Sequence, residues 1–104
     1  MHKVYSMLGI ARKGGNISIG FDAACIDIEK NKSTLVVIAS DASDKTKKNI
    51  KFICDKYNCA YIEFGEKEIL GKSLGRKVVS VLSVNDKNIA SYLINNIKML
   101  LDNV

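Results

Sequence analysis

The chain has 104 residues, 47% of them hydrophobic, which suffices for one buried core and is too few for several domains. Its formal net charge of +5 favours a polyanionic partner such as nucleic acid, although charge alone selects no particular one. The sequence has no signal-peptide core, no membrane-length apolar run and no C-x-x-C pair among its three cysteines, which predicts one cytoplasmic domain (residues 1–104) without disulfides or a zinc site.

The first part of the chain predicts two helices and two strands. An apolar stripe with helical spacing stops at Gly14-Gly15 and predicts a helix over residues 2–13. Residues 17–19 alternate apolar and polar side chains and predict a very short strand. A second helical stripe begins at Phe21, and a continuous apolar run over residues 35–40 predicts a buried strand.

The second part continues the alternation of helix and strand. Ser43 is expected to cap a third helix, residues 60–64 form a strand, and Gly65 opens a short helix over residues 66–74 that Gly75 ends. Further elements are an apolar strand over residues 78–83 and a final helix that Asp86 caps, with an apolar face that comprises Ile89, Leu93, Ile97, Leu100 and Val104. The expected fold class is α/β: a three-layer α/β/α sandwich with a small mixed sheet of about four strands and five helices. The expected core includes Leu8, Phe21, Val36, Ile38, Ile53, Ile62, Val79 and Leu93.

Catalytic side chains are scarce. His2 is the only histidine and stands beside the start of the sequence, so no Ser-His-Asp or Cys-His pair can be built on rigid elements. Gly71-Lys72-Ser73 resembles the end of a phosphate-binding P-loop, but Glu66 stands where that motif needs a glycine. The acids that could hold Mg²⁺ are better explained as helix caps or dipole partners; they are Asp41, Asp44, Glu63, Glu66 and Glu68. We therefore predict that the protein is not an enzyme and has no metal, cofactor or small-molecule substrate.

Three basic segments remain as candidates for binding. They are Arg12 to Asn16, the lysine-rich helix start over residues 45–51, and Ile69 to Lys77. Each has an ordinary structural explanation, since lysines solvate an exposed helix face, and cations and glycines are common at helix ends. Glycines that permit close backbone approach, flanked by Arg and Lys, are also what a phosphate backbone requires.

Read in order, these residues resemble a known family. The matching segments are Leu8 to Gly15, Gly20, Leu35 to Asp41, and Leu70 to Gly75. They resemble the kink-turn RNA-binding ribosomal protein family, which has the pelota-like RNA-binding fold, and within it the small bacterial YlxQ-type branch. The resemblance implies an α/β/α domain that grips sharply bent RNA through its second helix and the adjoining loops, aided by the loop after the fourth helix.

The chain departs from the family at the residues that contact bases. The family motif is Gly-x-Asn-Glu-x-x-Lys. This chain keeps its glycine as Gly20 and has Asp22, Ala23 and Ile26 in place of the Asn, Glu and Lys. Asn offers a base edge both a donor and an acceptor, whereas Asp offers acceptors only and brings a negative charge towards phosphates. Replacing Lys by Ile removes a phosphate-neutralising group. Lys30, one helical turn beyond Ile26, stands where the family often has a basic residue.

The resemblance therefore implies a site for structured RNA, either ribosomal RNA or another kink-turn-like RNA. The ribosome is a candidate binding partner, and no contact with a membrane is expected. The implied RNA-binding residues are Arg12, Lys13, Gly14, Gly20, Asp22, Ala23, Ile26, Lys30, Gly71, Lys72, Gly75, Arg76 and Lys77.

Two hypotheses from different classes follow. The first is a non-catalytic RNA-binding protein, ribosomal-protein-like, that docks bent or looped RNA. The alternative is a protein-interaction or ribosome-assembly factor that kept the fold and lost specific base readout, using an exposed Ile26. Fold alone cannot separate them, because one fold hosts many unrelated sites.

Overall fold

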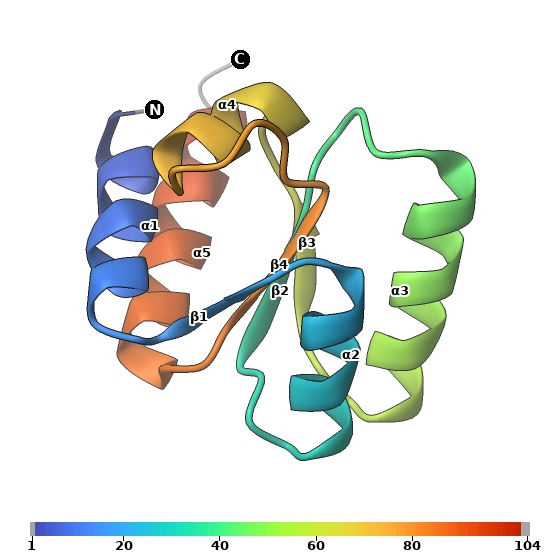
Figure 1. The fold of residues 1–104 in the computed structure, drawn as a ribbon. Helices are drawn as coiled ribbons and strands as arrows, with labels where there is room; N and C mark the ends of the chain where they lie inside the picture. The colour runs from blue at the N-terminus through green and yellow to red at the C-terminus, as the bar shows by residue number, and fades with distance from the viewer. Residues whose placement is uncertain (1, 103–104) are drawn as a thin grey trace.

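A computed structural model describes residues 2–102, which form five helices and four strands (Figure 1). In chain order these are α1 (His2–Lys13), β1 (Ile17–Ile19), α2 (Phe21–Glu29), β2 (Leu35–Ile38), α3 (Asp44–Lys56), β3 (Tyr61–Glu63), α4 (Lys67–Ser73), β4 (Val81–Val84) and α5 (Lys87–Asp102). The predicted fold class is confirmed. Val104, expected on the apolar face of the last helix, lies outside the described residues.

The four strands form one mixed sheet in the order β1-β4-β2-β3. β4 pairs antiparallel with both β1 and β2, whereas β2 and β3 are parallel. Figure 1 shows α1 and α5 on one side of the sheet, α2 and α3 side by side on the other, and α4 across one end. The two central strands, β2 and β4, are therefore covered on both faces, which explains why all their residues are buried.

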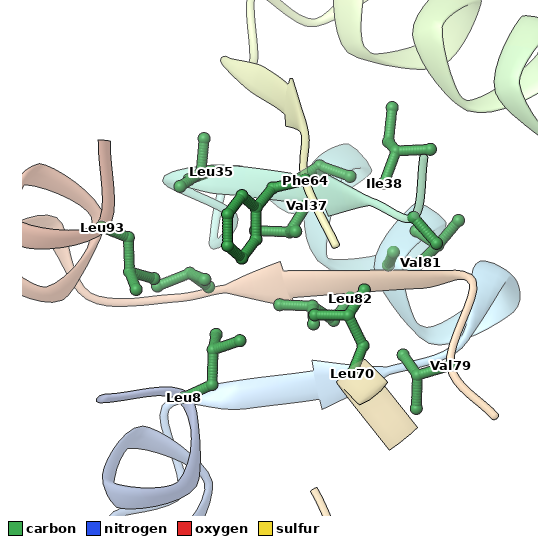
Figure 2. Packing of buried hydrophobic residues seen from close by; sticks show 14 of the residues in the cluster. Leu8, Leu35, Val37, Ile38, Phe64, Leu70, Val79, Val81, Leu82 and Leu93 are labelled. Atoms are coloured by element: carbon green, nitrogen blue, oxygen red, sulfur yellow. The ribbon is translucent and has the colours of Figure 1, made fainter. Parts of the chain in front are cut away.

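The core lies between the sheet and its helices. Figure 2 shows side chains of β2 and β4 meeting Leu8 of α1, Leu70 of α4 and Leu93 of α5. Five of the predicted core residues are buried, namely Leu8, Val36, Ile38, Val79 and Leu93. The other three, Phe21, Ile53 and Ile62, are half-buried and pack against this cluster.

The predicted bounds of β3 and the predicted end of β4 each differ by one residue, and two other strand boundaries were predicted wrongly by more. The apolar run over residues 78–83 was expected to be a strand, but β4 begins only at Val81. The segment before it is held against α4, because the N–H of Val79 donates to the carbonyl of Lys67 at 2.9 Å. The strand expected over residues 35–40 ends at Ile38, and the N–H of Ser40 donates to the carbonyl of Gly65 instead.

The predicted helix caps are confirmed. The Ser43 hydroxyl accepts a hydrogen bond from the N–H of Thr46 at 3.1 Å, and the Asp86 carboxylate accepts one from the N–H of Ile89 at 2.9 Å. At the other end of α1, Gly15 has a φ of +76°, and the N–H of Asn16 reaches back to the carbonyl of Ala11. Within residues 2–102, no helix is both long enough and apolar enough to cross a membrane.

Candidate nucleic-acid interface

One end of the sheet collects the starts of three helices. β1, β2 and β3 run in the same direction, since both neighbours of β4 are antiparallel to it. α2, α3 and α4 each follow one of these strands and begin at this end. Helix N-termini carry exposed N–H groups and a positive dipole, so this end of the fold favours anions.

Backbone hydrogen bonds join the segments at this end into a continuous surface. The N–H of Gly20 donates to the carbonyl of Val81 at 2.9 Å, and the N–H of Ala39 donates to the carbonyl of Ser80 at 2.8 Å. The N–H of Ser40 donates to the carbonyl of Gly65 at 2.8 Å, and its hydroxyl donates to the same atom at 3.0 Å. The start of α2 thus lies directly beside the segment that enters β4.

The start of α2 is open. Gly20 precedes the helix with φ 105° and ψ 161°, a conformation that is essentially restricted to glycine. No side chain in the described residues caps this helix, and the first N–H with a backbone partner is that of Ala24, which donates to Gly20. No described atom outside the adjacent residues lies within 4 Å of the position that a Cβ on Gly20 would take. A ligand backbone can therefore approach this helix end closely.

The starts of α3 and α4 have protein partners. Ser43 caps α3, as described above, and Asp44 lies in its first turn. The carboxylate of Asp41 accepts a hydrogen bond from the N–H of Lys67 at 2.8 Å, so Asp41 caps α4 from the loop after β2. This contact agrees with the interpretation of the acidic residues as helix caps rather than metal ligands. Among residues 2–102, no three His, Cys, Asp or Glu side chains gather as metal ligands would.

The charge of Glu63 is balanced by two lysines of α3. Its carboxylate oxygens lie 2.6 Å from Lys51 Nζ and 3.0 Å from Lys47 Nζ. The hydrogen bond from Lys51, followed by that from Lys47, lowers the pKa of Glu63 below its ordinary value. Both lysines are thus engaged within the protein, which leaves other cations to meet an anionic ligand.

The loop after α4 is built on two glycines. Gly75 has a φ of +70° and ends α4, and the N–H of Arg76 donates to the carbonyl of Gly71 at 2.8 Å. The chain then crosses back over α4, so that a Cβ on Gly71 would lie 2.7 Å from the carbonyl oxygen of Lys77. Arg76 and Lys77 are exposed on this loop.

We expect Gly71→Ala to destabilise the protein by about 1 to 3 kcal/mol, because the added methyl meets backbone atoms that cannot rotate away. Chemical denaturation should show this loss as a lower transition midpoint. Gly9→Ala is the matched control, since a Cβ there would lie at an ordinary 3.5 Å from Ser73. A fully stable Gly71→Ala protein would contradict the close crossing.

The fold brings the first basic segment to this loop. A Cβ on Gly75 would lie 3.7 Å from a guanidinium nitrogen of Arg12, the penultimate residue of α1. Lys13 and Gly14 follow and are exposed. Within residues 2–102, neither Arg12, Lys13, Arg76 nor Lys77 forms a salt bridge. Two segments more than 60 residues apart in sequence therefore form one region of unpaired positive charge.

Three predicted site residues lie elsewhere. Lys30 is the C-cap of α2, at the helix end opposite to Gly20. Gly71 is buried beneath the crossing chain, where it shapes the loop. Lys72 lines a groove of about 460 Å³ between α1 and α4, together with His2, Tyr5, Ile69 and Ser73.

The exposed face of α2 has a mixed character. Asp22 and Lys30 are exposed, and Ile26 between them is 51% exposed, in agreement with their i, i+4 spacing. Ala23 is half-buried. Glu29, three residues after Ile26, is exposed as well, so this face presents two acids, one apolar side chain and one base.

Sequence reasoning did not include the loop after β2, or residues 78–80 directly before β4, in the site. Ser40, Gly65 and Ser80 carry the backbone contacts that hold the three helix starts together. The sequence gives one indication of these contacts, the polar pair Ser40-Asp41 directly after a buried strand. The partner of each contact is distant in sequence, so no local pattern could identify it.

Comparisons with known proteins identify the family to which this sequence is similar. Residues 2–93 match the model of the ribosomal protein L7Ae/L30e/S12e/Gadd45 family. The chain belongs to this family. Among its relatives, the RNA-binding protein YlxQ of Bacillus subtilis is 29% identical over 91 residues, covering 88% of this chain and 91% of that protein. The large ribosomal subunit protein eL8 of Cenarchaeum symbiosum is 28% identical over 98 residues, covering 93% of this chain and 78% of that protein.

A solved structure has the same fold as this chain. A protein of unknown function from Bacillus halodurans superposes with a TM-score of 0.85 and 27% identity, covering 89% of this chain and 94% of that one. The three-layer fold with its small mixed sheet is therefore the fold of a solved, similar protein.

Proposed function

We propose that this protein is a non-catalytic RNA-binding protein of the ribosomal type, acting as a single domain that docks bent or looped structured RNA. The binding surface comprises the start of α2, the loop over residues 75–80 and the Arg12 side chain of α1. Family membership supports an RNA ligand, since similar proteins carry the names RNA-binding protein YlxQ and ribosomal protein eL8. Ribosomal RNA, on or off the ribosome, is the ligand class that these names favour.

One observation carries the proposal. The open, uncapped start of α2 lies beside the loop after α4 through the hydrogen bond between Gly20 and Val81, and Arg12 reaches that loop at Gly75. Free N–H groups at a helix start, glycines without side chains and unpaired cations all suit phosphate oxygens. The start of α2 and the segment that enters β4 lie together at one end of the sheet, and the Arg12 guanidinium reaches the loop after α4 from α1.

The same surface favours backbone contacts over base readout. Arg12, Arg76 and Lys77 are exposed cations beside the loop, and Lys13 and Lys30 are exposed at the far ends of α1 and α2. At its start, the α2 face offers a base edge only the acceptor oxygens of Asp22. We therefore propose that the bent or looped, kink-turn-like RNA is bound chiefly through its phosphates, and that specific readout of the kink-turn is weak.

This proposal predicts a gain on restoring the family motif. The native protein should show little preference for a kink-turn RNA over a duplex of equal length. The triple variant Asp22→Asn, Ala23→Glu, Ile26→Lys should improve that preference by about 1 kcal/mol or more, roughly one good bidentate base contact. Fluorescence anisotropy with both RNAs at one salt concentration measures the difference.

The single variant Ile26→Lys is the control for added charge. It should strengthen binding to both RNAs alike, because a lysine on phosphate carries no sequence information. If the native protein already prefers the kink-turn by about a hundredfold and the triple variant adds nothing, recognition resides in the loops after α1 and α4, and α2 is not the element that limits readout.

The second candidate function is a protein-interaction or assembly factor, and the exposure of Ile26 favours it. An apolar side chain in the middle of an exposed helix face suits a protein partner better than a phosphate backbone. If no structured RNA binds at low salt, this second function replaces the first.

A further inference from the structure

A second exposed face of the molecule combines an aromatic ring with lysines. Phe52, on α3, is 69% exposed, more than any other large hydrophobic residue that the structure describes. Lys48 precedes it by four residues, Lys56 follows by four, and Lys45 precedes it by seven, so all three share its helix face. Each of the three lysines is exposed, and none forms a salt bridge within residues 2–102.

This face differs from an ordinary solvated helix surface. An isolated exposed apolar residue needs no explanation, but this ring lies between unpaired cations one turn above and below it. Asp55, and Asp44 in the first turn, add two negative charges on the same side, against the three lysines. The lysines on the neighbouring inner flank, Lys47 and Lys51, are by contrast held by Glu63. The outer face of α3 therefore presents the exposed ring of Phe52 surrounded by lysines that have no acidic partner in the part of the chain that the structure describes.

The adjoining edge of the sheet has the same character. β3 is an edge strand, and its Tyr61 is 37% exposed. The ammonium of Lys51 lies 5.9 Å from the centre of the Tyr61 ring, and that of Lys56 lies 5.6 Å from the centre of the Tyr57 ring. Alternating aromatic rings and ammonium groups are what a single-stranded nucleic acid requires, because bases stack on rings while phosphates pair with cations.

This face is continuous with the interface proposed above. α3 begins at the sheet end where α2 also begins, and Figure 1 shows the two helices side by side. Phe52 lies eight residues beyond the first residue of α3, about 12 Å along the helix axis. An RNA strand that leaves the structured site can reach this face without crossing the protein.

Resting on the proposed function, we propose that the outer face of α3 binds a single-stranded RNA segment flanking the structured site. One base stacks on Phe52, and Lys45, Lys48 and Lys56 pair with the adjoining phosphates. The flank is recognised through stacking and charge, so its base sequence matters little.

The test compares two RNAs that share a structured core, one blunt and one with single-stranded extensions at both ends. Anisotropy titrations should show tighter binding of the extended RNA by roughly 5- to 100-fold, the effect of stacking about one base. Phe52→Leu should remove this gain while leaving the affinity for the blunt RNA unchanged, and Phe52→Tyr should retain it. Tyr92→Leu, an exposed aromatic on α5, is the matched control and should change neither.

The outcomes separate the two proposals. If the blunt RNA binds but the extension adds nothing, or its gain survives Phe52→Leu, this inference is overturned and an acidic protein partner becomes the better occupant. If the blunt RNA does not bind, the function proposed above fails. The binding of the single-stranded extension, supplied alone as an oligonucleotide, then tests the stacking face. Loss of this binding in Phe52→Leu upholds the stacking face, and equal binding by the native and variant proteins overturns it.

Discussion

Ile38→Ala should lower the free energy of unfolding by about 2 to 5 kcal/mol. Ile38 is fully buried in β2, between β4 and β3 and under helices on both faces, so its lost methyl groups leave a cavity that surrounding elements cannot fill. Urea denaturation monitored by circular dichroism measures the change, provided that the slope with denaturant stays constant.

Ile10→Ala is the matched control for this substitution. Ile10 lies on α1 and is 62% exposed, so the same chemical change should alter stability by less than about 0.5 kcal/mol. A loss below about 1 kcal/mol at Ile38 would mean that β2 is not the centre of the core.

The second large effect concerns salt. If the five exposed cations Arg12, Lys13, Lys30, Arg76 and Lys77 neutralise phosphates, affinity for structured RNA should fall with a log–log slope of about −3 to −5. Between about 50 and about 200 mM salt this is a loss of roughly 60- to 1,000-fold, which follows from counterion release. Filter-binding or anisotropy titrations across that range give the slope directly.

Variants that lack a charge test whether the proposed surface is responsible for this dependence of affinity on salt. Arg76→Gln with Lys77→Gln should make it less steep by about two units, because each lost phosphate contact contributes about one. Lys98→Gln, on α5, is the control and should leave the slope unchanged. An affinity that does not depend on salt would contradict an interface built on phosphate contacts.

The fold could be predicted where the sequence is locally consistent. The stripe on α1 ends at the glycine pair that terminates it, and Ser43 and Asp86 cap the helices that follow them. β2 is a continuous apolar run because helices cover both of its faces. In each case residues within one or two turns determine the structure.

The site could be predicted less completely, because its contacts are distant in sequence. Val78 and Val79 look like part of a strand, yet the crossing over Gly71 holds them against α4. Asp41 caps a helix that begins 26 residues later, and Arg12 meets Gly75 from the other end of the sequence. Periodicity and propensity contain no information about such pairings.

The most direct test of the RNA interface is to map it by nuclear magnetic resonance. The ¹⁵N-labelled protein is titrated with a structured, bent RNA, and the changes in amide chemical shift are assigned to residues. We expect the largest changes to cluster at the start of α2 from Gly20 to Ala23 and in the loop over residues 75–80, with the Arg12 side chain as the contact from α1. Changes confined to the opposite end of the sheet, around Ser33 and Asn85, or to the outer face of α5, would contradict the proposed interface.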